Sequence, residues 1–190
     1  MIFAPDAEQA LGSIVALLNT LGPTTDHLLT PADLNHFITR EGFTGSRTGD
    51  DAELRSVRQL RTQLAEIWLA GEDEAVLRVN AILRNARALP QLVKHDESRY
   101  HLHATTPQAP LSERMAAEAA MALVDVIRSG EQDRLRSCAA SDCRAVLLDL
   151  SKNRSKRYCD TGNCANRDHV RAYRRRLSAR KSTDPTQMRG

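Results

Sequence analysis

The four cysteines constrain this chain most, because all of them lie within 27 of its 190 residues. Cys138, Cys143, Cys159 and Cys164 follow the pattern C-x4-C-x15-C-x4-C. Two close pairs joined by a loop of this length are typical of a tetrahedral zinc site, for which thiolates are well suited. The spacing therefore predicts one structural Zn²⁺ ion bound by all four cysteines.

Two disulfides are the alternative use of these cysteines, and they would need an oxidising compartment. The N-terminal sequence MIFAPDAEQ has neither a basic segment nor a long apolar segment, so it predicts no secretory signal peptide. The longest apolar run, 119–124, is far shorter than the ~18 residues that would cross a bilayer. We therefore expect a cytoplasmic protein without a membrane partner, in which zinc is favoured over disulfides.

Charge divides the chain into two parts. Residues 1–133 carry 12 basic and 19 acidic side chains, a net charge of −7, whereas residues 134–190 carry 15 and 5, a net charge of +10. Such asymmetry favours a polyanionic partner for the basic part. A solvated basic segment that only aids solubility is the alternative.

Apolar periodicity predicts a helical N-terminal domain. Helical spacing covers 6–21, 31–41, 51–70, 73–86 and 112–128, and alternation around 91–104 predicts a small β-hairpin. Thr30 and Asp50 or Asp51 are expected to cap the second and third helices. Asn19, near the end of the first helix, is expected to cap it or to form a local hydrogen bond, and a small-ligand pocket lined by Asn19 and Thr20 is the alternative.

The cysteine-rich part predicts a second small domain. A metal-binding turn precedes a strand over 146–150, a polar turn, a returning strand over 155–159 and a helix over 165–177. The predicted fold class is thus mainly α. A helical domain (1–130) with a β-hairpin precedes a treble-clef-like zinc finger (134–181) made of a hairpin and a helix, and 182–190 form a disordered tail.

The predicted finger helix has two faces. Val170, Tyr173 and Leu177 share the side that we expect to pack on the hairpin and the zinc site. Arginines gather on a neighbouring side, where Asp168 is the only acidic residue, and the hairpin adds further cations. The candidate nucleic-acid-binding residues are Arg154, Lys156, Arg157, Arg167, Arg171, Arg174 and Arg175.

Arginine suits phosphate because its planar guanidinium donates two parallel hydrogen bonds. Seven cations on one small domain would neutralise several phosphates and release their counterions. Double-stranded DNA is favoured over RNA, because RNA recognition usually needs exposed stacking aromatics and Tyr173 is expected to be buried. A solvated helix face is the remaining alternative.

Both parts of the sequence resemble a known family. The segment ending in Cys164-Ala165-Asn166-Arg167 is similar to the CGNR zinc finger, with Ala165 in place of the glycine of that motif. The helical part resembles the ABATE domain through LLNT (17–20), LLTPADL (28–34), LRSVRQLRTQL (54–64) and LRVNAIL (77–83). The resemblance implies a transcription regulator, linked to stress, whose finger binds DNA.

We therefore predict a zinc-finger DNA-binding regulator that is associated with the nucleoid, and whose helical domain senses a signal or forms a homodimer. A protein-interaction adaptor with a purely structural zinc, or an RNA-binding protein, are the alternatives. Enzymatic activity is not expected, because four cysteines would close the zinc shell and the sequence has no HExxH, GxSxG or Walker motif. Arg167 could contact phosphate or brace the finger, and the sequence does not decide between these roles.

Overall fold

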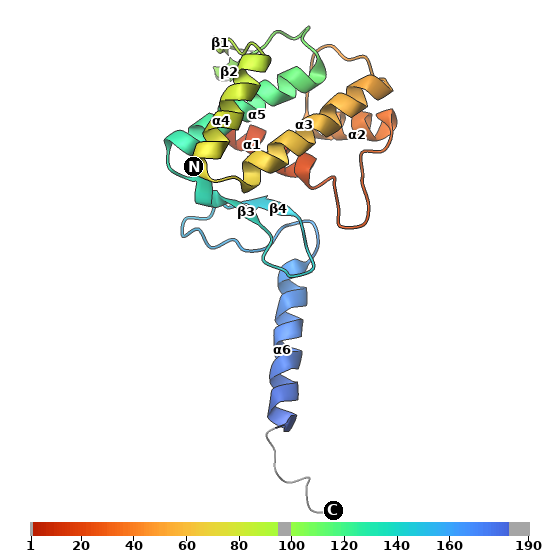
Figure 1. Cartoon of the computed structure of the whole chain (residues 1–190), viewed down its shortest axis with the longest axis vertical. Helices are drawn as coiled ribbons and strands as arrows, with labels where there is room; N and C mark the ends of the chain where they lie inside the picture. Colours follow the sequence, from red (N-terminus) through yellow and green to blue (C-terminus); the bar gives the residue numbers. More distant parts are fainter. Residues whose placement is uncertain (1, 95–99, 183–190) are drawn as a thin grey trace, which may run out of the picture.

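The fold is mainly α, as the sequence predicted (Figure 1). The computed structural model describes residues 2–94 and 100–182, with side chains up to residue 178. The helices are α1 (Pro5–Leu18), α2 (Pro31–Glu41), α3 (Asp51–Leu69), α4 (Glu72–Asn85), α5 (Leu111–Arg128) and α6 (Cys164–Ser182). The strands are β1 (Gln91–Val93), β2 (His101–His103), β3 (Leu135–Ser137) and β4 (Val146–Leu148), and a 3₁₀ turn (Gln132–Arg134) precedes β3.

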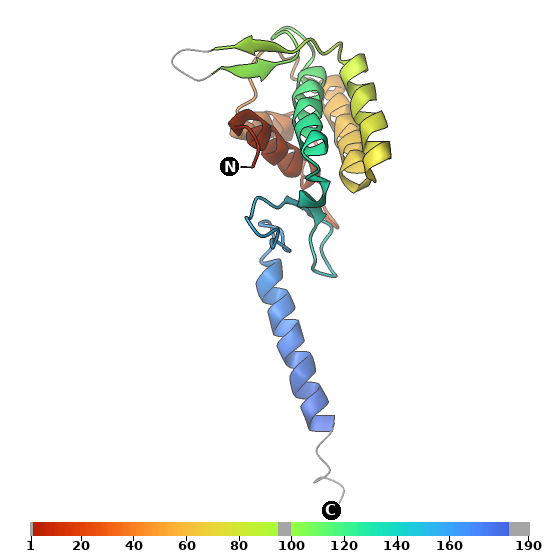
Figure 2. The same cartoon turned by 90° about the vertical axis from the view of Figure 1, so that its left-hand side faces the viewer.

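The first five helices form a bundle in which α5 packs against α1, α3 and α4 (Figures 1 and 2). The caps predicted from the sequence are present: Thr30 forms a capping box with Asp33, and Asp50 accepts a hydrogen bond from the Glu53 amide. Two strands pair as the predicted hairpin, with Leu92 opposite Leu102, while the intervening residues 95–99 lie outside the described part.

The first helix is shorter than predicted and ends at Leu18 rather than at residue 21. The chain turns back on itself here, because the His27 amide donates to the Thr20 carbonyl and Leu21 forms an antiparallel bridge with Asp26. Thr20 also bonds locally, donating its hydroxyl to the Leu17 carbonyl at 2.6 Å.

The hairpin of the cysteine-rich part differs from the prediction. β4 pairs antiparallel with β3, whereas residues 155–159, predicted as its partner, form no strand. The buried Asp149 carboxylate explains the difference, because it accepts hydrogen bonds from the backbone amides of Ser151 (2.9 Å) and Lys156 (3.0 Å). These bonds hold the segment after β4 as a loop.

The two faces of β4 join the helical domain to the finger. Val146 and Leu148 belong to the main hydrophobic core, whereas Leu147 packs in the cluster that contains the cysteines. The Asn19 side chain accepts from the Val146 amide at 2.8 Å and donates to its carbonyl at 2.9 Å. The local bond predicted for Asn19 was therefore wrong, since its partner is a strand 127 residues away.

The C-terminal helix α6 projects away from the rest of the protein (Figures 1 and 2). Val170, Tyr173 and Leu177 are 40%, 56% and 40% exposed, so the prediction that they pack on the hairpin and the zinc site was wrong. The side-chain contacts of α6 with the cysteine-rich loops, within the described residues, come from its first turns, through Arg167 and Arg171. Most of the predicted tail, residues 183–190, lies outside the described residues.

Candidate metal centre and nucleic-acid interface

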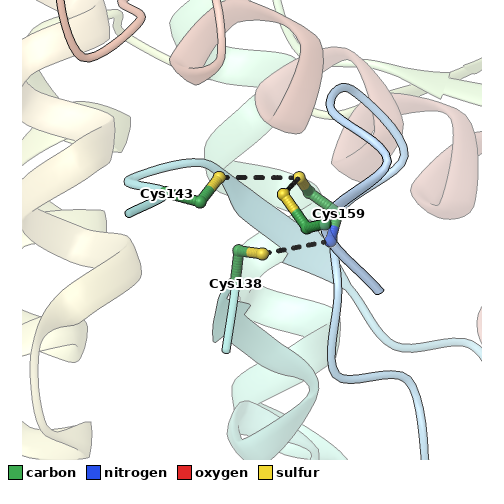
Figure 3. A group of neighbouring side chains, drawn as sticks. Cys138, Cys143 and Cys159 are labelled. Carbon is green, nitrogen blue, oxygen red and sulfur yellow. Dashed lines mark hydrogen bonds between the residues drawn. The ribbon is translucent and has the colours of Figure 1, made fainter. Parts of the chain in front are cut away.

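The structure brings the four cysteines together at one point (Figure 3). Their sulfur atoms all lie within 4.8 Å of one another, and Cys159 Sγ is 3.7 Å from Cys143 Sγ and 3.6 Å from Cys164 Sγ. A tetrahedral site with Zn–S bonds of about 2.3 Å separates its sulfurs by about 3.8 Å. The four sulfurs are not bonded to one another, and this donor set and spacing fit a zinc ion.

Backbone hydrogen bonds place the two cysteine pairs. Cys138 directly follows β3, and its amide donates to the Ala145 carbonyl at 2.8 Å. The Cys143 amide donates to the Ala140 carbonyl at 3.0 Å, and this bond closes the first turn. Cys164 is the first residue of α6, and Asn163 before it adopts a φ of 45°, a left-handed conformation that asparagine tolerates. The first thiol pair therefore comes from a turn after β3, and the second from a turn that begins α6.

The clustered thiols shift one another's pKa values. Burial and hydrogen bonds with the neighbouring thiols raise the pKa of Cys164 to about 12. Burial acts in the same direction on Cys159, but hydrogen bonds with Thr161 and the other thiols outweigh it and lower its pKa to about 7. The close thiols therefore shift the pKa values of Cys159 and Cys164 in opposite directions. A divalent metal ion would stabilise the fully deprotonated set.

Hydrogen-bond donors surround the sulfurs. The Thr161 hydroxyl lies 3.2 Å from Cys159 Sγ, and the Cys159 amide lies 3.5 Å from Cys138 Sγ. Arg167 donates from Nη2 to Cys164 Sγ at 3.3 Å. Donors in these positions orient metal ligands and offset part of the negative charge of four thiolates.

Asp142 connects α6 to the first cysteine turn. Its carboxylate pairs with Arg171, and one of its oxygens lies 3.5 Å from Arg167 Nη2. The hydrogen bond from Arg171 holds the pKa of the Asp142 carboxyl below its usual range. Of the two roles left open for Arg167, these contacts match bracing of the finger.

Ala165 occupies an ordinary helical position. It is the second residue of α6, and it is not among the residues with positive φ. A glycine is therefore not needed there for conformational reasons, and alanine is the better helix former.

Two of the remaining candidate cations are paired with carboxylates. Arg154 pairs with Asp133 (2.6 Å) and Glu131, at the junction with the helical domain. Lys156 pairs with Asp160 at 2.7 Å. Acidic partners are therefore more frequent around these cations than the sequence suggested.

The other three candidates have no carboxylate partner within the described residues. Arg157 lies over the Tyr158 ring, 5.9 Å from its centroid. Arg174 and Arg175 are exposed on the projecting part of α6. Among the seven candidate residues, these three are the most available to a partner.

Sequence reasoning missed Asp142 and Asp149, which organise the finger from within. Each lies within six residues of a cysteine, and an acidic residue beside cysteines in a basic segment is the signal that could have identified both. It also missed Trp68, whose indole Nε1 donates to the Arg136 carbonyl of β3 at 3.2 Å. No sequence pattern predicts that contact, because it joins residues 68 positions apart.

Comparison with known families agrees with the two parts of the structure. Residues 13–130 match the ABATE family, described as "Putative stress-induced transcription regulator", and residues 134–177 match the CGNR zinc finger. No curated protein is detectably similar to the chain. Within the described residues, no helix has the length and apolar character needed to span a membrane. The order and the extent of the two matches show that the chain belongs to the ABATE family and ends in a CGNR zinc finger.

Proposed function

We propose that this protein is a zinc-dependent DNA-binding transcription regulator that contacts duplex DNA through α6. The main support is that α6 extends away from the rest of the protein (Figure 2). A single helix in this position can enter the major groove of DNA, which is about 12 Å wide. The sequence of α6 has seven basic residues and one acidic residue. The four cysteines would bind one structural zinc ion, which holds the first turn of α6 against the finger.

The proposal needs no catalytic step, since four sulfur ligands would leave no open position on the metal. A cytoplasmic location, in contact with the nucleoid, follows from it. RNA remains a competitor, because Tyr173 is 56% exposed and an exposed ring can stack on bases. DNA is therefore favoured by the shape of α6, and no longer by a lack of aromatics.

The unpaired arginines give the sharpest test. Replacing Arg174 and Arg175 by glutamine in one variant removes two exposed cations that have no carboxylate partner among the described residues. With random-sequence duplex DNA, the slope of log K against log[salt] should become shallower by about 2. The matched control is Arg154→Gln, whose cation already pairs with Asp133 and Glu131, and its slope should equal that of the wild type.

The same titration with RNA of matched sequence distinguishes the two nucleic acids. Tighter binding of RNA than of DNA would contradict the DNA assignment. An unchanged slope in the double variant would show that the exposed part of α6 is not the interface.

A protein-interaction adaptor is the second candidate, and the apolar stripe of α6 favours it. Val170, Tyr173 and Leu177 are exposed at i, i+3 and i+7, the spacing of a coiled-coil seam. If α6 pairs with that of a second copy, replacing Val170 and Leu177 by serine should convert a dimer to a monomer in sedimentation equilibrium. A wild-type protein that is monomeric at high concentration would exclude this pairing.

A further inference from the structure

A cavity of about 230 Å³ lies where the helical domain meets the finger. Its lining includes residues from three helices and one strand: Trp68 of α3, Ala75 of α4, Ile127 of α5 and Leu135 of β3. Gln132, from the turn that leads into β3, is the one polar side chain among the described residues of its lining. The side chains that line the cavity are therefore mainly apolar, and they come from both parts of the protein.

The Gln132 amide has an unmet hydrogen bond. Its Nε2 atom is buried and has no partner among the described residues. A buried donor without a partner is destabilising, and nearly all buried polar groups in proteins are satisfied by protein, water or a ligand. An N–H group needs an acceptor, so the missing partner is an oxygen or nitrogen atom with a free lone pair.

The size and lining of the cavity define the chemical class of a ligand. An apolar cavity of about 150 Å³ is large enough to bind benzene, so this one has room for a substituted ring. The described lining contains no charged side chain, and a charged ligand would lose its hydration without compensation. We propose that the cavity binds a small uncharged ring compound with one carbonyl group, whose oxygen accepts a hydrogen bond from Gln132.

Such a ligand would contact the elements that connect the two parts. Leu135 and Arg136 are neighbours in β3, and the Arg136 carbonyl accepts the hydrogen bond from Trp68. An occupant therefore lies against both the indole ring and the strand that supports β4. A role as the signal input of the regulator rests on the function proposed above, whereas binding itself does not.

The single tryptophan of the chain provides a direct readout. In the ¹⁵N-labelled, zinc-loaded full chain, the indole N–H resonance of Trp68 is followed during titration with acetophenone and, separately, with ethylbenzene. These probes share a ring and differ in the carbonyl. Both should shift the resonance saturably, and acetophenone should bind about 3- to 10-fold more tightly.

Two variants test the role of the amide. Gln132→Met keeps the approximate shape and removes the donor, so the preference for acetophenone should disappear. Gln63→Met, at an exposed position on α3, is the matched control and should keep it. Ala75→Leu fills the cavity and should abolish binding of both probes.

Three outcomes would overturn the proposal. The first is a Trp68 resonance that neither probe shifts up to its solubility limit. The second is equal affinity for the two probes in the wild type, which would mean that water satisfies Gln132. The third is a preference for acetophenone that survives Gln132→Met. DNA affinity is measured separately, so a failure of DNA binding leaves these results interpretable.

Discussion

At the residue scale, one ion pair shows how a polar contact holds the loop after α1. Asp26 accepts hydrogen bonds from both terminal nitrogens of Arg61 at 2.7 Å, and Arg61 is only 6% exposed. The hydrogen bonds from Arg61 outweigh burial and lower the pKa of the Asp26 carboxyl from 3.8 to about 2. This pairing could not be read from the sequence, which places the two residues 35 positions apart among many other charges.

Asp26→Asn should therefore destabilise the protein by about 3 kcal/mol, because it leaves the Arg61 cation buried without its counter-charge. Denaturant unfolding at pH 7 measures the loss, with the exposed Asp73→Asn as the control. A lowered folded-state pKa stabilises only above the unfolded value. The difference from the wild type should thus be full above pH 4 and fade between pH 3.8 and about 2. A difference that persists unchanged at pH 2 would contradict this account.

Asn19 is the residue whose role the sequence placed wrongly, because helix-end statistics cannot reveal a strand that arrives much later in the chain. Asn19→Ala removes both hydrogen bonds to Val146. The backbone amide and carbonyl of Val146 then lose those partners. We expect a loss of about 1 to 3 kcal/mol. Hydrogen exchange at the Val146 amide should accelerate, whereas the exposed Asn35→Ala should leave it unchanged. Unchanged protection in Asn19→Ala would show that the contact does not hold the finger.

At the element scale, local signals predicted most of the helices. Thr30, Pro31 and Gly42 determine the ends of α2, because a capping side chain, a fixed φ and a left-handed residue each act within one turn. The strand partner of β4 was predicted wrongly because strand pairing is non-local. The Lys156 amide donates to the Asp149 carboxylate, and this bond holds the predicted partner segment as a loop. Similarly, the apolar spacing on α6 predicted burial, although Val170, Tyr173 and Leu177 stay 40% to 56% exposed among the described residues.

The start of α6 gives a prediction at this scale. Ala165→Gly restores the glycine of the CGNR motif but places it inside a helix. It should lower helix stability by about 0.5 to 1 kcal/mol, because glycine loses more backbone entropy than alanine. Thermal unfolding of the zinc-loaded protein, followed by circular dichroism at 222 nm, measures the change. Increased stability would mean that this position favours a conformation other than the helical one.

At the scale of the whole molecule, the finger and the helical domain are not independent. Four cysteines at C-x4-C-x15-C-x4-C predicted the cluster correctly, because a metal-binding pattern depends on spacing within a short segment. The shared core could not be predicted in the same way. Val146 and Leu148 lie in the finger sequence, yet they pack in the core of the helical domain.

Loss of a single cysteine should consequently affect both parts. Cys159→Ser should prevent zinc retention and unfold residues 135–178, and the helical domain should lose on the order of 3 kcal/mol as Val146 and Leu148 leave its core. Hydrogen–deuterium exchange by region, together with metal analysis, measures both effects. Ser141→Ala, between the first two cysteines, is the control and should keep the metal. Full zinc stoichiometry in Cys159→Ser would contradict the ligand assignment.

A zinc-dependent DNA interface on α6 is best tested by titrating labelled random-sequence duplex DNA with the wild-type protein over a range of salt concentrations, with zinc bound and after chelation. The expected result is tight binding at low salt, a steep fall in affinity as salt rises, and loss of binding when zinc is removed. Absence of binding at low salt by the zinc-loaded protein, or binding that survives chelation unchanged, would contradict such an interface.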